Sequence, residues 1–174
     1  MQEVLKIDFN ENNHGTSEKM YAHLNKELHK AFSVFIHDGN GNMLIQKRSS
    51  DKYHSGGLWT NACCSHPLTD DIYLEAQFRM QQELGFSSDI EFVDKFVYFT
   101  DFPGGVFEYE LDYVYIGMHN STLPIKYNSS EIDEVLWIPI DSLLNDVMES
   151  PEKYTKWFIT ALYMVVCHMK RQAK

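Results

Sequence analysis

The sequence contains few cysteines and few basic residues, and each shortage excludes a class of protein. Three cysteines, Cys63, Cys64 and Cys167, are an odd number with two adjacent, which does not suit a disulfide-stapled secreted domain. We therefore expect a reducing compartment. Lysine and arginine number 15 against 25 aspartates and glutamates, leaving a net charge of −10. This charge repels nucleic acids and anionic membrane surfaces, so we expect no nucleic-acid partner, although a local basic cluster could still bind a small phosphorylated ligand.

Long apolar segments are also lacking. The longest uncharged stretch near the C-terminus, residues 157–167, is well short of the roughly 20 residues that a membrane-spanning helix needs. Residues 1–10 carry Glu3, Lys6 and Asp8 and have no apolar centre, unlike a secretory signal peptide. We therefore expect a cytoplasmic protein with no membrane partner.

What remains is the composition of a packed globular chain. Apolar residues make up 44% of the 174 residues and charged residues 23%. No internal repeat, low-complexity tract or Pro/Gly/Ser-rich linker divides the sequence. We therefore expect one domain over residues 1–174, monomeric or weakly dimeric.

Hydrophobic periodicity and turn residues predict a mixture of strands and helices. Strands are expected at residues 4–9, 31–37, 43–46, 58–64, 90–100, 106–118 and 135–138, and a polar turn at 10–15. The segment Asp38-Gly39-Asn40-Gly41 predicts a hairpin between the second and third of these strands. Helices are expected at 72–84, ended by Gly85, and at 141–148 and 154–170. This order favours an α/β (α+β) fold with a mixed β-sheet covered by helices.

The predicted strand at 106–118 carries the most informative pattern. Alternation places Glu108, Glu110 and Asp112 on one face, and aromatic and aliphatic side chains on the other, which we expect to face the core. The acidic face could be a solvated outer surface or one wall of a functional site. Candidate ligands elsewhere in the chain decide between the two.

Three histidines could complete such a site. His29 lies just before the strand at 31–37, His23 precedes it by six residues, and His66 closes the segment 59–67. Three imidazoles and two carboxylates suit a divalent ion such as Zn, Mn or Fe. None of the three lies in a HExxH or zinc-finger pattern, so each could equally be an ordinary polar residue.

Other candidates also have an ordinary alternative. Cys64 ends a predicted strand where a ligand could reach its thiol, but a buried inert cysteine is the default interpretation. Arg79 and Glu83 are four residues apart on the predicted helix, as in an exposed ion pair. A basic cluster could bind a diphosphate or could simply be hydrated. It consists of Lys47, Arg48 and Lys52.

Several motifs in a fixed order resemble one enzyme family. Residues 28–35 read LHKAFSVF, 57–61 read GLWTN, 64–67 read CSHP and 108–110 read EYE. Over residues 18–157 the chain resembles the type I isopentenyl diphosphate isomerases of the Nudix superfamily. The resemblance implies a Nudix-type mixed sheet sandwiched between α-helices. It also implies an enzyme of isoprenoid biosynthesis that interconverts isopentenyl and dimethylallyl diphosphate by adding a proton at one carbon and removing one at another.

The resemblance further implies a role for individual residues. A divalent ion, Mn²⁺, Zn²⁺ or Mg²⁺, would be held by His23, His29, His66, Glu108 and Glu110. The catalytic groups would be Cys64, Glu110 with Tyr98 nearby, and Trp157, whose ring face would stabilise a carbocation. Glu83 would hold a Mg²⁺ ion that bridges to the diphosphate of a small-molecule substrate. The phosphate-binding cations would be Lys19, Arg48, Lys52 and Arg79.

The helix at 72–84 departs from the wider Nudix pattern. That pattern ends in Arg-Glu-x-x-Glu-Glu-x-Gly, whereas residues 78–85 read FRMQQELG, with Glu83 as the one acidic residue. Nudix pyrophosphohydrolysis uses several carboxylates to hold metal and activate water, so this departure favours the isomerase. A Nudix-type diphosphate hydrolase and a catalytically silent metal-binding domain are the alternatives.

Overall fold

The structure is a computed structural model that describes residues 2–172. Its strands are β1 (Glu3–Ile7), β2 (Asn13–Glu18), β3 (His29–His37), β4 (Asn42–Arg48), β5 (Trp59–Thr60), β6 (Cys63–Ser65), β7 (Ile90–Phe102), β8 (Val106–Met118) and β9 (Ile132–Pro139). Its helices are α1 (Lys19–Asn25), α2 (Ile72–Leu84), α3 (Ile140–Glu149), the 3₁₀ helix η1 (Pro151–Lys153) and α4 (Lys156–Gln172). No helix within the described residues is both long and apolar enough to cross a membrane.

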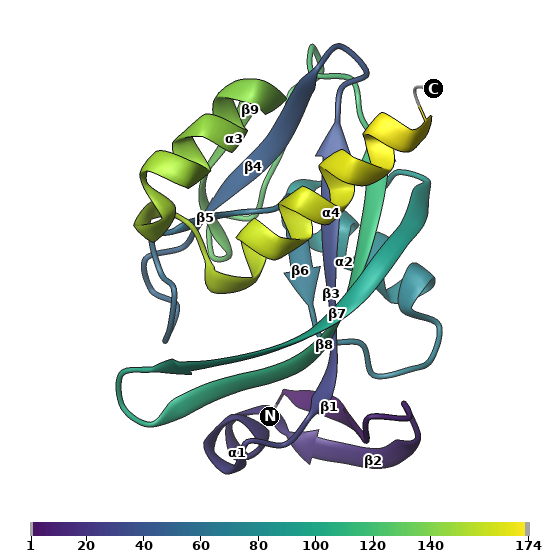
Figure 1. Ribbon diagram of the computed structural model, residues 1–174, viewed down its shortest axis with the longest axis vertical. Helices are drawn as coiled ribbons and strands as arrows, with labels where there is room; N and C mark the ends of the chain where they lie inside the picture. The colour runs from purple at the N-terminus through teal and green to yellow at the C-terminus, as the bar shows by residue number, and fades with distance from the viewer. Residues whose placement is uncertain (1, 173–174) are drawn as a thin grey trace.

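Strand β3 lies at the centre of a mixed sheet (Figure 1). It pairs parallel to β8 from His29 opposite Glu110 onward, and antiparallel to β6, where Ser33 lies opposite Cys64. Eight of its nine residues are buried, and its central stretch, residues 31–36, is apolar apart from Ser33. Strands β7 and β8 form a long hairpin that extends beyond the helices, and β1, β2 and α1 pack near one end of β3.

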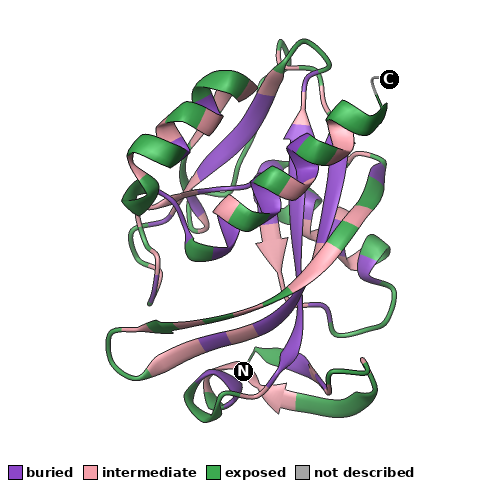
Figure 2. Cartoon of the chain, viewed as in Figure 1, coloured by how far each residue is buried: buried purple, intermediate pink, exposed green. Residues whose placement is uncertain are grey.

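Helices cover both faces of this sheet. Residues of α2, including Met80 and Leu84, pack against Phe32 and Val34 on one face. On the other face, α3 and α4 pack over a second set of buried residues, Phe35, Met43, Ile45, Val114, Leu143, Val147, Phe158 and Leu162. Figure 2 shows the buried strands between the outer helices, whose exposed faces point away from the sheet. The predicted mixed sheet sandwiched between helices is therefore confirmed.

The helix at residues 72–84 is confirmed at both ends. The Asp71 side chain accepts a hydrogen bond from the Leu74 backbone N–H at 3.1 Å and so caps the first turn. Gly85 ends the helix at φ +75°, and a Cβ atom there would lie 2.7 Å from the Lys126 carbonyl oxygen. Because these signals are local, the sequence alone is sufficient to place this helix. The predicted hairpin is also confirmed, with Ile36 opposite Leu44.

Three local expectations were wrong, and one helix was missed. Residues 10–15 are not wholly a turn, because β2 begins at Asn13, and the helix α1 was not predicted at all. Helix α1 has seven residues and begins where the Glu18 carboxylate accepts a hydrogen bond from the Tyr21 backbone N–H at 2.8 Å. The predicted strand at 58–64 is divided into β5 and β6. Helix α4 begins at Lys156 rather than at Tyr154, because Tyr154 pairs with Trp59.

Candidate active site

A cavity of about 600 Å³ lies where β3, β6 and β8 meet the loop that follows β4. Every predicted site residue except the two buried histidines His23 and His29 contributes to its lining. These lining residues are Lys19, Arg48, Lys52, Cys64, His66, Arg79, Glu83, Tyr98, Glu108, Glu110 and Trp157. His23 and His29 lie directly behind one wall, beside His66.

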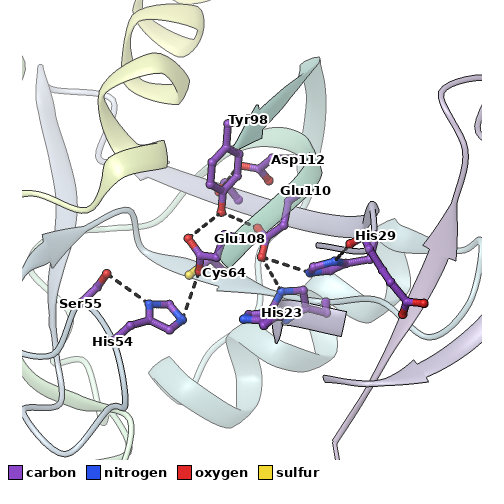
Figure 3. A network of polar contacts seen from close by, with 12 residues as sticks. His23, His29, His54, Ser55, Cys64, Tyr98, Glu108, Glu110 and Asp112 are labelled. Atoms are coloured by element: carbon purple, nitrogen blue, oxygen red, sulfur yellow. Dashed lines mark hydrogen bonds and ion pairs between the residues drawn. The ribbon is translucent and has the colours of Figure 1, made fainter. Parts of the chain in front are cut away.

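Four side chains at this wall are arranged as a metal site would require. One ligand atom from each of His23, His29, His66 and Glu110 lies within 4.8 Å of the others. The parallel pairing of β3 and β8 places His29 opposite Glu110, and the turn after β6 brings His66 to the same carboxylate. Glu110 Oε1 lies 2.9 Å from His66 Nε2. The same oxygen lies 3.4 Å from His29 Nε2 (Figure 3). These four residues could bind a metal ion.

The protonation states of this cluster also fit a metal. Burial lowers the pKa of His23 to about 3 and that of His66 to about 4, so both rings are neutral near pH 7. Among the described residues, the buried Nε2 atoms of His23 and His29 have no hydrogen-bond partner. Neutral imidazoles with a free ring nitrogen are the form that coordinates divalent ions. A buried carboxylate beside them supplies the anionic ligand.

Tyr98 joins Glu110 to the neighbouring carboxyl group of Glu108. Its hydroxyl lies 2.5 Å from Glu110 Oε2 and 3.2 Å from Glu108 Oε2 (Figure 3). Burial and the adjacent Glu110 charge raise the pKa of Glu108 well above its usual range. Burial opposes ionisation of Glu110 as well, but the contacts that His66 and His29 make with this carboxylate outweigh burial and lower the pKa of Glu110. Two buried carboxyls and a phenol thus form a group that can hold and move a proton.

The acidic face of β8 is therefore not a solvated surface. Glu108, Glu110 and Asp112 are buried, whereas the aromatic side chains Phe107 and Tyr109 on the opposite face are only partly buried. Of the two alternatives, the wall of a functional site is the one found, because the acidic residues line the cavity, while Leu111 and Tyr115 on the opposite face join buried core clusters. Alternation identified the two faces but not which one is enclosed.

Cys64 presents its thiol to the cavity and not to the core. Strand alternation places Cys63 among the fully buried residues beneath α2. The neighbouring Cys64 is partly exposed, and its Sγ lies 3.9 Å from Arg48 Nη1. Burial raises the pKa of Cys64 to about 12, so the group is a neutral thiol near pH 7. The thiol therefore carries a proton at the cavity wall.

Trp157 forms an aromatic wall whose position is fixed by hydrogen bonding. Its indole Nε1–H donates to Asn61 Oδ1 at 3.2 Å, and Asn61 Nδ2 donates to the Cys63 carbonyl at 2.6 Å. The Trp157 ring centroid lies 6.3 Å from that of Tyr98, and the Arg48 guanidinium lies 5.4 Å from the Trp157 ring. The ring is thus held between the base of α4 and the cavity.

The cations Lys19, Arg48, Lys52 and Arg79 all line the cavity, whereas Lys47 is absent from the lining. The alternative of an exposed Arg79–Glu83 pair was wrong, because the Glu83 side chain is 5% exposed. Arg79 Nε donates to Glu83 Oε1 at 2.6 Å. Burial raises the pKa of Glu83. The ordered positions of these groups make this end of the cavity suited to an anion.

Comparison with known proteins assigns this arrangement to a family. A model of the NUDIX domain matches residues 27–158. A protein named isopentenyl-diphosphate Delta-isomerase from Serratia proteamaculans is 38% identical over 160 residues, covering 91% of this chain and 88% of that protein. The chain belongs to the Nudix isopentenyl-diphosphate Delta-isomerase family. Isopentenyl-diphosphate Delta-isomerase 2 from Aromatoleum aromaticum is 36% identical over 165 residues, covering 94% of this chain and 86% of the relative.

Solved structures agree with the fold expected of a Nudix isomerase. The protein DR0079 from Deinococcus radiodurans aligns with a TM-score of 0.75 at 14% identity, covering 93% of this chain and 98% of that one. A MutT protein from Methanosarcina mazei Go1 aligns with a TM-score of 0.65 at 13% identity, covering 84% and 96%. At such identities the similarity concerns the fold alone. The family and the Nudix-type fold that the motifs implied are confirmed.

Several residues that line the isomerase cavity received no role from the sequence, and Asp112, His54 and Glu131 are three of them. Asp112 continues the acidic alternation of β8, which was a usable signal; its Oδ2 accepts a hydrogen bond from Ser33 Oγ at 2.8 Å. His54 Nε2 lies 3.2 Å from Glu108 Oε1, and Glu131 contacts Lys52 and Arg79. His54 and Glu131 belong to loops without a recognisable pattern, so only the fold could bring them into the site.

Proposed function

We propose that this protein interconverts isopentenyl diphosphate and dimethylallyl diphosphate in isoprenoid biosynthesis, in the cytoplasm. One observation carries the proposal. A protonated thiol, Cys64, and a carboxylate–phenol pair, Glu110 and Tyr98, line the same cavity as an aromatic wall and a group of cations. The family relatives bear the name of this isomerase.

The reaction requires two proton-handling groups. Protonation of the terminal alkene carbon produces a tertiary carbocation, and removal of a proton from the carbon on its other side gives the new double bond. Cys64 and Glu110 are the two groups, working from opposite faces of the substrate, with Tyr98 hydrogen-bonded to Glu110 at 2.5 Å. The proton gained in one step and that lost in the other balance, so the reaction needs no oxidant or reductant.

Trp157 stabilises the cation between the two steps. The face of an indole ring attracts positive charge, and the hydrogen bond to Asn61 holds this ring in place. An enclosed site also excludes water, which would otherwise trap the carbocation as an alcohol.

The residues fit two divalent ions. His23, His29, His66 and Glu110 lie close enough together to hold Mn²⁺, Zn²⁺ or Mg²⁺. Glu108 lies outside that group of four, is linked to Glu110 through the Tyr98 hydroxyl, and would be the fifth ligand. Glu83 would hold Mg²⁺ against the diphosphate. A bound ion would supply positive charge that sets the protonation of the carboxyl groups around it. Lys19, Arg48, Lys52 and Arg79 would bind the phosphate oxygens, so that the diphosphate anchors the reacting carbons between Cys64 and Glu110.

Hydrolysis is the alternative activity of this fold. Glu83 is the one acidic residue in the stretch 78–85, and Arg79 engages it at 2.6 Å, which leaves no array of helix carboxylates to activate water. The geometry therefore favours proton transfer over phosphate chemistry.

Proton NMR of isopentenyl diphosphate tests the proposal. The metal-loaded protein is incubated with this substrate and Mg²⁺ in deuterated buffer. We expect dimethylallyl diphosphate with deuterium incorporated, since the incoming proton exchanges with solvent. Unchanged substrate with correctly metallated, folded protein would overturn the isomerase, and release of inorganic phosphate from nucleoside diphosphates would establish the hydrolase instead.

A further inference from the structure

The carboxylate of Glu131 engages two of the cations that line the cavity. Its Oε2 accepts a hydrogen bond from Lys52 Nζ and lies 3.2 Å from Arg79 Nη2. The pKa of Glu131 is lowered because the contacts from Lys52 and Arg79 outweigh its partial burial, so the group is ionised. The Glu131 carboxylate therefore occupies two of the cations, Lys52 and Arg79, that we propose bind the diphosphate.

The backbone around Glu131 is fixed on both sides. The Asn128 backbone N–H donates to the Glu83 carbonyl at 2.8 Å, which ties this turn to the end of α2. The Ser49 N–H donates to the Glu131 carbonyl at 2.9 Å, which ties it to the loop that carries Lys52. The Glu131 side chain itself is 25% exposed, compared with 5% for Glu83. Glu131 can therefore turn toward water without moving the chain, whereas Glu83 is enclosed.

Repulsion between the cations explains why a carboxylate is needed beside Lys52 and Arg79 when no diphosphate is bound. Lys52 and Arg79 converge on one point, with Arg48 on the same cavity wall, and like charges in a partly buried site repel strongly. Glu83 pairs with Arg79, whereas Glu131 contacts both Lys52 and Arg79, so Glu131 is the carboxylate that offsets the repulsion between these two cations in the free protein. A diphosphate brings its own negative charge to the same cations, so a carboxylate left between them would compete with it and repel it.

We propose that Glu131 is a built-in competitor for the diphosphate subsite: it neutralises Lys52 and Arg79 in the free protein and is displaced when a diphosphate binds. This inference rests on the proposed function in one respect, the assignment of these cations to the diphosphate. It adds a residue that sets substrate affinity without taking part in the proton transfers.

Calorimetric titration with inorganic pyrophosphate in magnesium-free buffer tests the proposal. We expect Glu131→Gln to tighten pyrophosphate binding about tenfold, the gain if the carboxylate covers the cations for roughly nine-tenths of the time. Glu131→Asp, which keeps the charge on a shorter side chain, should tighten binding less. The exposed Glu134, three residues further along, provides the matched control, because Glu134→Gln removes the same charge away from the cavity.

Each alternative outcome contradicts the proposal. Weaker binding in both Glu131 variants would show that the carboxylate holds the cations in position for the ligand. Unchanged binding would show that the carboxylate does not compete with the ligand. An equal gain in Glu134→Gln would attribute the effect to net charge. Adding Lys52→Gln to Glu131→Gln should reduce the gain, since one of the covered cations is gone. Pyrophosphate binding is measured without turnover, so a failure of the isomerase in the NMR experiment would be seen separately.

Discussion

Two adjacent cysteines allow the proposed thiol chemistry to be separated from protein stability. Cys64→Ala should lower isomerisation about 10²–10⁴-fold, the usual contribution of a proton-transferring side chain. Its sulfur faces the cavity and is partly exposed, so we expect a change of less than about 0.5 kcal/mol in the free energy of unfolding.

Cys63→Ala is the matched control with the opposite expectation. Cys63 is fully buried among core residues beneath α2, so alanine there removes one buried heavy atom. That loss costs about 1 kcal/mol and lowers the melting temperature by about 2–4 °C in a chain of this length. Turnover should stay within about threefold of the unsubstituted protein, because Cys63 does not line the cavity.

The assay combines proton NMR of the isomerisation in deuterated buffer with thermal unfolding of each variant. Cys64→Ala retaining turnover within tenfold of the unsubstituted protein would refute the proton-transfer role. Equal losses of activity in Cys63→Ala and Cys64→Ala would refute the assignment of the two side chains to different environments.

Three further predictions concern the aromatic wall, the magnesium ligand and the buried histidines. Trp157→Leu should lower kcat at least about tenfold with a smaller change in KM, because the ring acts on the cation and not on the bound substrate; steady-state NMR kinetics measure both. Glu83→Gln should reduce the strengthening of pyrophosphate binding by Mg²⁺, as calorimetry at several Mg²⁺ concentrations would show, while the metal content of the histidine cluster stays the same. In metal-free protein, burial lowers the pKa of His23 to about 3 and of His66 to about 4, from 6.5. The unfolded chain therefore binds more protons below pH 6.5, and stability should fall as pH drops toward 4, by up to about 1.4 kcal/mol per pH unit for each histidine; urea unfolding in the presence of a chelator measures this.

Each of these has a result that contradicts it. Equal effects of Trp157→Leu on kcat and 1/KM would indicate a substrate-binding wall. An unchanged magnesium dependence in Glu83→Gln would remove that residue from the ion. Stability of the metal-free protein that is constant between pH 7 and 5 would show that the histidines are hydrated and not enclosed.

Local signals were sufficient for several elements of the fold. Asp71 and Gly85 mark the ends of α2 in the sequence, and the glycines after Asp38 mark the β3–β4 hairpin, because caps and turns depend on a few neighbouring residues. Helix α1 escaped prediction because seven residues are too few to show a helical period, and a helix so short depends on packing. His23 was a candidate ligand from the sequence, but the helix that carries it was not predicted.

The sequence by itself determined the class of fold, the family and the residue types of the site, since motif order and strand alternation are properties of the chain. Only the tertiary structure decided which face of β8 is enclosed, because burial depends on where β8 lies in the sheet. It also decided which groups meet. Glu110 contacts two histidines from distant segments through strand pairing, and Glu131 reaches Lys52 and Arg79 through a loop whose sequence has no pattern. Such contacts join residues separated by tens of positions, and no local preference encodes them.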